Sequence, residues 1–219
     1  MSVKENLQHI SSTLTEGVEL VAVSKTKPNA LIEEAYASGQ RHFGENKVQE
    51  LVDKYEALPK DIQWHLIGHL QTNKVKYISP FVHLIHAVDS RKLTKEIQKR
   101  ASQNERTIDI LVQIRIAKEE TKFGLPFDEA EELLKDLREN KYPNVRVVGL
   151  MGMATNTDNE TQITNEFSAL KSFYDTQQEL NQNFKTLSMG MSGDYKLAMQ
   201  CGSTMVRVGS SIFGARNYT

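Results

Sequence analysis

The chain has 219 residues, enough for one large domain with a buried site, and its 27 Lys and Arg residues against 28 Asp and Glu residues exclude the basic field that nucleic-acid binding requires. Its one cysteine, Cys201, excludes an intramolecular disulfide and is typical of a reducing compartment. No apolar run approaches membrane-spanning length, so we expect a cytoplasmic protein with neither nucleic-acid nor membrane partners.

Short β-branched runs alternate with longer segments of helical period along the chain, a pattern typical of parallel strands linked by crossover helices. It predicts eight strands, at residues 18–25, 41–46, 64–68, 84–89, 108–116, 145–153, 186–191 and 204–209. It predicts connecting helices at residues 29–38, 47–58, 72–78, 91–103, 128–139, 160–181 and 194–199.

Eight such units favour an α/β fold of the single-domain (β/α)8 barrel type, although an open doubly wound sheet shows the same alternation. An extra amphipathic helix at residues 3–14 is expected to pack across the bottom of the barrel as a lid. No linker or repeat divides the chain, so we predict one domain over residues 1–219. In either architecture, chemistry belongs at the carboxyl ends of the strands.

The first predicted strand ends at Lys25, which alternation places on the same face as Val21 and Val23. If the valines point into the barrel, the lysine points into its mouth. Burial lowers the pKa of a lysine and makes it a nucleophile that forms a Schiff base with a carbonyl. A lysine at a strand end is more often solvated, and Lys27 is a second candidate amine, although it adjoins Pro28 and is expected in the loop. Whether Lys25 is solvated or reactive must therefore be judged from the residues at the other strand ends.

Asn46, His65 and Met151 belong to the second, third and sixth strands and are candidates for the barrel mouth. Asn46 can donate and accept hydrogen bonds, and His65 can stack or hydrogen-bond near a ring, although a histidine alternating with apolar residues is more often part of a core. Met151 at most lines the pocket wall. We predict no metal site, because the spacing of the other histidines is not typical of one: His9, His42, His83 and His86.

Glycine and serine follow the last two strands. Ser192 follows the seventh strand, and Gly209, Ser210 and Ser211 follow the eighth. Such turns present backbone N–H groups and hydroxyls to an anion, and the loops after strands seven and eight are a recurrent phosphate site in barrels. They predict a phosphorylated ligand, although one such turn alone is explained equally well by turn geometry.

Arg207 interrupts an otherwise apolar strand, where a guanidinium needs a partner. Two partners remain open: a structural carboxylate, or the ring nitrogen of a cofactor. Its position two residues before Gly209 favours the cofactor.

Together these segments resemble the pyridoxal phosphate homeostasis protein family, single-domain relatives of the N-terminal barrel of alanine racemase. The resemblance covers essentially the whole chain, and its motifs occur in the family's order: Ala22-Val23-Ser24-Lys25-Thr26-Lys27-Pro28, Phe43-Gly44-Glu45-Asn46, Trp64-His65 with Ile67-Gly68, Leu70-Gln71-Thr72-Asn73-Lys74, Gly149-Leu150-Met151, Leu187-Ser188-Met189-Gly190-Met191-Ser192, and Val206-Arg207-Val208-Gly209 through Ile212-Phe213-Gly214-Ala215-Arg216.

The resemblance implies a site for pyridoxal 5′-phosphate (PLP). It implies an imine to Lys25, phosphate contacts from Ser192 and the Gly209-Ser210-Ser211 turn, Arg207 near the pyridine nitrogen, and Asn46 close to the cofactor. Two positions depart from the family pattern: His69 stands where a proline is common, and Gly193 where an acidic residue is common. These departures affect only the expected loop geometry.

The resemblance further implies a role in PLP homeostasis, as a monomeric reservoir or carrier whose partners are PLP and the apoenzymes that accept it. Racemisation also needs positioned acid and base groups, which a second domain supplies in alanine racemase. Because this chain ends at Thr219 after the eighth unit, we expect no such domain and no catalytic residues. Two alternatives remain: a PLP-dependent amino-acid racemase of low efficiency, and a barrel enzyme that uses Lys25 on a sugar-phosphate carbonyl without PLP.

Overall fold

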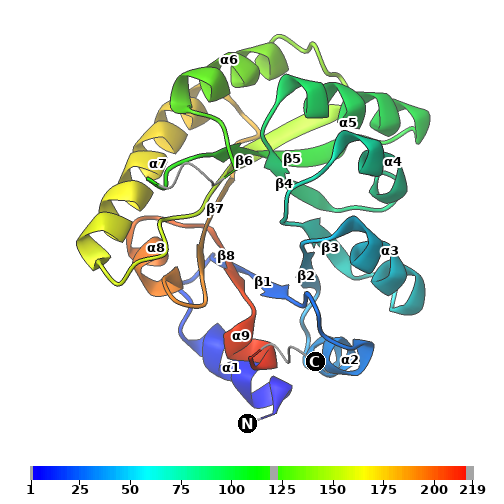
Figure 1. Cartoon of the computed structure of the whole chain (residues 1–219), viewed down its shortest axis with the longest axis vertical. Coiled ribbons are helices and arrows are strands. Elements are labelled where there is room, and N and C mark those ends of the chain that lie inside the picture. Colours follow the sequence, from blue (N-terminus) through cyan, green and yellow to red (C-terminus); the bar gives the residue numbers. More distant parts are fainter. Residues whose placement is uncertain (1, 119–122, 216–219) are drawn as a thin grey trace.

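Eight parallel strands form a closed barrel in which each strand pairs with its neighbours in the chain and β1 pairs with β8 (Figure 1). The computed structural model describes residues 2–118 and 123–215, so Arg216 of the last motif lies outside the described residues. The strands are β1 (Glu19–Val23), β2 (His42–Glu45), β3 (Gln63–Leu66), β4 (Leu84–Val88), β5 (Ile108–Ile114), β6 (Val145–Gly152), β7 (Thr186–Met191) and β8 (Met205–Val208).

Helices alternate with the strands and form a ring outside the barrel (Figure 1). The helices are α1 (Val3–Ser12), α2 (Asn29–Ala37), α3 (Val48–Ala57), η1 (Thr72–Lys74), α4 (Val75–Ile78), α5 (Arg91–Gln103), α6 (Phe127–Arg138), α7 (Glu160–Leu180), α8 (Tyr195–Gln200) and α9 (Ser210–Phe213). The predicted barrel is confirmed, and the open sheet is excluded. Within residues 2–118 and 123–215, none of the helices is both long and apolar enough to cross a membrane.

Two apolar clusters stabilise the barrel. The larger cluster joins strand side chains to helix side chains and therefore lies between the barrel and its ring of helices. The smaller cluster contains residues of strands that lie on opposite sides of the barrel, so it fills the interior: Val21, Leu84, Leu111, Val148, Met151 and Met205. Val21 therefore points into the barrel interior, which meets the condition on which the orientation expected for Lys25 depends.

The expected lid at the bottom of the barrel is wrong. Helix α1 lies in the outer ring beside α2 and α9 (Figure 1), and the side-chain amide of Asn6 donates to the carbonyl oxygen of Ile212 at 2.9 Å. Its apolar face, formed by Val3, Leu7 and Ile10, belongs to the larger cluster. The reason is the length of α9. A helix of four residues covers too little of the sheet beside β8 and β1, and α1 fills the remaining place in the ring.

Candidate functional site

A pocket of about 630 Å³ opens at the carboxyl end of the barrel, among residues near the ends of β1, β2, β3, β5, β6, β7 and β8 or in the loops that follow them. This is the face on which βα barrels carry their chemistry. The pocket brings together six of the nine predicted site residues: Lys25, Asn46, Ser192, Arg207, Gly209 and Ser210.

Lys25 lies half-buried in the turn after β1, two residues beyond the end of the strand at Val23. The next residue, Thr26, has a φ of 64°, a left-handed conformation that is unfavourable for a β-branched side chain. Its N–H donates to Glu50 Oε1 at 2.5 Å, which holds the turn. The ammonium of Lys27 instead donates to the carbonyl oxygen of Gly214 at 2.9 Å. Both lysines line the pocket.

A buried charged network supports this turn from the side of α3. Glu45 is fully buried, and its Oε1 accepts hydrogen bonds from Ser24 Oγ at 2.5 Å and from Lys54 Nζ at 2.8 Å. Lys54 also donates to the carbonyl oxygen of Ser24 at 2.8 Å and to Glu50 at 2.7 Å. Burial raises the pKa of Glu45 to about 7, and the nearby Lys54 ammonium opposes that shift. The network therefore fixes the backbone on both sides of Lys25.

Replacing Lys54 with methionine is expected to lower the free energy of unfolding by about 3–5 kcal/mol at pH 8, because the Glu45 carboxylate is left buried without its cation. In the parent, burial raises the pKa of Glu45 from the usual 4.5 to about 7, so the folded protein binds this proton more tightly than the unfolded chain does. The bound proton stabilises the folded state at low pH, and this stabilisation is lost as the pH rises from 4.5 to about 7. Removing Lys54 raises this pKa further, and the loss should be smaller at pH 5.

Urea denaturation at the two pH values tests this expectation. Lys47→Met, at an exposed position next to α3, is the control and should change stability by less than about 0.5 kcal/mol. Equal losses for Lys54→Met at pH 5 and pH 8 would show that the charge on Glu45 is not the cause.

The loops after β7 and β8 are joined at one side of the pocket. The Gly209 N–H donates to Ser192 Oγ at 3.2 Å, and Asp194 Oδ1 accepts from the Met191 N–H at 2.6 Å and closes the β7 loop. A Cβ on Gly209 would lie 3.0 Å from the carbonyl oxygen of Val23, so glycine allows the β8 turn to approach β1 closely. The loops predicted to hold a phosphate therefore meet next to the end of β1.

Arg207 forms part of the pocket floor and is 3% exposed. Its guanidinium donates to Ser188 Oγ at 2.5 Å and to the carbonyl oxygen of Gly152 at 3.2 Å. Burial lowers its pKa to about 10, and the charge of half-buried Asp194 opposes that shift. Because its hydrogen bonds go to a hydroxyl and a carbonyl, the guanidinium retains donor capacity for a ligand in the pocket.

The three other predicted residues do not line the pocket. Met151 is fully buried in the interior cluster, and Ser211 is exposed on α9. His65 is fully buried below the pocket, where it contacts His42 and His86.

These histidines form a hydrogen-bonded chain through the barrel. It runs from Glu19 to His42 (2.7 Å), to His65 (3.0 Å), to His86 (2.9 Å) and to Ser188 (3.2 Å). The hydroxyl of Ser188 also accepts from the Arg207 guanidinium. Burial lowers the pKa of His65 and of His86 well below the usual value, so both rings are neutral. With a neutral His42 bonded to Glu19 through Nε2, each buried ring would donate from Nε2 and accept at Nδ1. The chain therefore orders the polar interior beneath the pocket.

Several pocket residues were not predicted from the sequence. His69 stacks on Phe123, with ring centroids 4.3 Å apart, and its Nδ1 lies 3.5 Å from Asp89. Gln113 alternates with inward-facing Leu111 along β5, so strand alternation could have identified it. The sequence identifies His69 only as a departure from the family pattern, in which a proline is common at this position. In the structure this departure places an imidazole on the pocket wall.

The fold is a closed barrel of eight parallel strands, with a lysine after the first strand and joined glycine–serine turns after the last two. These features define the class of the alanine racemase N-terminal barrel. The family model for the N-terminal domain of alanine racemase matches residues 1–217. The alanine racemase of Clostridium difficile shares this fold, with a TM-score of 0.79 and 14% identity over 98% of this chain and 57% of that one.

The chain belongs to the pyridoxal phosphate homeostasis protein family, which confirms the resemblance inferred from its motifs. The member from Aquifex aeolicus is 43% identical over 202 residues, covering 91% of this chain and 88% of the relative. The member from Haemophilus influenzae is 40% identical over 207 residues, covering 92% and 86%. The structure of PipY from Synechococcus elongatus with PLP bound has a TM-score of 0.88 and 35% identity, over 97% of this chain and 100% of that one.

Proposed function

We propose that the chain is a single PLP-binding domain, residues 1–219, that stores PLP and supplies it to apoenzymes. The observation that carries this proposal is the meeting of Lys25, Arg207 and the joined Ser192 and Gly209 loops in one pocket of about 630 Å³. Ligand pockets for small molecules are typically about 300–1,000 Å³. The names of the relatives and the PLP bound to PipY point to the same ligand.

The donors around the pocket fit the three functional groups of PLP. Lys25 offers an amine that would hold the aldehyde carbon as an imine, and Arg207 offers N–H donors for the ring nitrogen. Ser192, Gly209 and Ser210 offer hydroxyls and backbone N–H groups for the phosphate, and Asn46 would lie beside the cofactor. PLP would supply an electron sink when bound, and these residues would bind and orient it.

Replacing Ser192 with alanine is expected to weaken PLP binding by about 10- to 100-fold, since charge-assisted hydrogen bonds contribute about 1.5–3 kcal/mol. The barrel should remain folded, because Ser192 lies in a partly exposed loop. Titration of each variant with PLP, followed by fluorescence, measures the affinity. Ser172→Ala, at an exposed position on α7, is the control. An unchanged affinity in Ser192→Ala would place the phosphate elsewhere.

Absorption spectroscopy combined with a transfer assay tests the proposed function. The PLP-loaded protein should be yellow, and mixing it with a cofactor-free PLP enzyme should restore that enzyme's activity as the visible absorbance of the donor falls. A colourless protein in excess PLP would contradict PLP binding and favour the sugar-phosphate alternative. Enantiomer exchange of L- or D-amino acids above the rate with free PLP would favour the racemase.

A further inference from the structure

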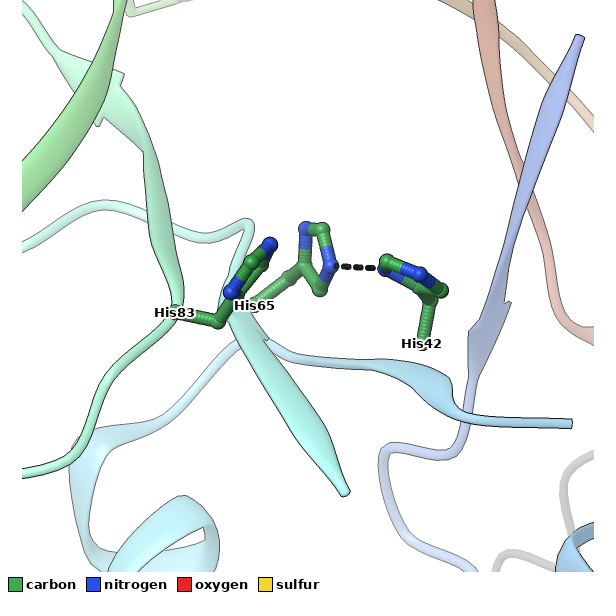
Figure 2. Close-up of side chains that lie close together, drawn as sticks. All are labelled: His42, His65 and His83. Atoms are coloured by element: carbon green, nitrogen blue, oxygen red, sulfur yellow. Dashed lines mark hydrogen bonds between the residues drawn. The ribbon is translucent and has the colours of Figure 1, made fainter. Parts of the chain in front are cut away.

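Three histidines meet at the end of the barrel opposite the pocket. His42 is the first residue of β2, His65 is the third residue of β3, and His83 directly precedes β4. One ring nitrogen of each lies within 4.8 Å of the other two, and Figure 2 shows the His65 ring between those of His42 and His83. The spacing along the chain did not predict this cluster, because three different strands bring its members together.

The cluster has nearly the dimensions of a metal site. In a tetrahedral zinc site with Zn–N bonds of about 2.0–2.1 Å, ligand nitrogens lie roughly 3.3 Å apart. His42 Nδ1 and His65 Nε2 are already 3.0 Å apart. The ring centroid of His83 lies 5.3 Å from that of His65 and 5.7 Å from that of His42. Because the His83 side chain is exposed, it can rotate to close the remaining gap without repacking the core.

In His42 and His65, the nitrogen that faces away from the cluster is already bonded. His42 Nε2 lies 2.7 Å from Glu19 Oε1, so in the neutral ring that donates to Glu19 the lone pair of Nδ1 faces the cluster. The far nitrogen of His65, Nδ1, lies 2.9 Å from His86 Nε2. Metal-binding histidines usually have the outer nitrogen bonded in this way, and a carboxylate on that nitrogen makes the ring a stronger ligand.

From this geometry we propose that His42, His65 and His83 form a binding site for one divalent transition-metal cation of the zinc type, which imidazole nitrogens prefer. His42 binds through Nδ1 and His65 through Nε2, and Glu19 orients His42. Exposed His83 leaves the fourth coordination position open to water. The site lies at the other end of the barrel from Lys25 and does not depend on the proposed PLP function.

Binding replaces the hydrogen bond between His42 and His65 with three metal bonds, one from each histidine. The proton on His65 Nε2 leaves to solvent at exposed His83, and His65 takes the Nε2 proton of His86 onto its own Nδ1. His86 then accepts at Nε2 and takes a replacement proton onto Nδ1, passed on from solvent through the hydroxyl of Ser188. Each ring remains neutral with one proton, and the charge of the cation is offset by the Glu19 carboxylate bonded to His42 and by solvent at exposed His83.

Isothermal titration calorimetry of the untagged, PLP-loaded chain with Zn²⁺ tests the proposal. The parent should bind one zinc ion, and His83→Ala should weaken binding at least 10-fold while keeping its fold, because His83 is exposed. Glu19→Gln should weaken binding by about 10- to 100-fold. His9→Ala, which removes an exposed histidine from α1, should bind zinc like the parent.

Anomalous scattering at the zinc edge from a soaked crystal locates the ion. A peak between the three rings, together with the loss of affinity in His83→Ala, supports the site. A peak elsewhere, or equal zinc affinity in the parent and His83→Ala, overturns it. Repeating the titration on the PLP-free chain separates this result from the cofactor, because the proposed site should bind zinc equally in both forms.

Discussion

Replacing Lys25 with alanine is expected to abolish the imine absorbance of the PLP-loaded protein while leaving weaker, reversible binding of PLP. The imine requires an amine at this position, whereas the phosphate contacts of the joined β7 and β8 loops remain. We expect the affinity to fall by roughly two orders of magnitude, equivalent to about 2.7 kcal/mol. The rise in melting temperature on adding PLP should shrink accordingly, because a ligand stabilises in proportion to its affinity. Absorption spectra and thermal melts with and without PLP measure both effects.

The stability of the cofactor-free variant provides the internal control. Lys25 is half-buried at the pocket edge, so its removal should change the free energy of unfolding of the PLP-free protein by less than about 1 kcal/mol. Lys27→Ala should keep the visible absorbance. A Lys25→Ala protein that melts far below the cofactor-free parent would make Lys25 a structural residue and move the PLP role to another amine.

Replacing Gly149 with alanine is expected to cost more than about 3 kcal/mol and to prevent stable folding. Gly149 has a φ of +155° and pairs with Thr186 of β7, and an added Cβ would lie 1.7 Å from the carbonyl oxygen of Thr186. Backbone cannot move away as a flexible side chain does, so β6 and β7 would have to separate. Urea denaturation measures the loss.

Gly17→Ala is the matched control for Gly149→Ala. Gly17 also has a positive φ, +82°, but an added Cβ there meets nothing within 4 Å. It should therefore show only the conformational cost of about 1–2 kcal/mol. Equal losses at the two positions would mean that the close approach of β6 to β7 contributes nothing.

The alternation of strands and helices predicts the face that carries the pocket, because a parallel strand requires a continuous apolar run and residues after its end are free to be polar. The number of units, eight, favours the barrel over an open sheet. Lys25, Asn46 and Ser192 were found on this basis, and they line one pocket. The ends of the strands were less predictable. β1 ends at Val23, so Lys25 occupies a turn whose conformation depends on Glu50, a residue of α3 that the strand pattern does not involve.

The features that the sequence did not predict arise from contacts between distant segments. Met151 and His65 are directed into the barrel interior rather than toward the mouth, which depends on the stagger of the strands. The place of α1 depends on the short length of α9. The histidine cluster depends on the pairing of β2, β3 and β4, which no local spacing reveals.

Borohydride reduction followed by peptide mapping tests the assignment of Lys25 most directly. Reduction fixes PLP on its lysine, and trypsin no longer cleaves after the modified residue. Trypsin also fails to cleave between Lys27 and Pro28, so a label on Lys25 predicts a single modified peptide spanning residues 5–41. A label on Lys27 would leave cleavage after Lys25 intact and appear on residues 26–41, and that result would contradict the proposed site.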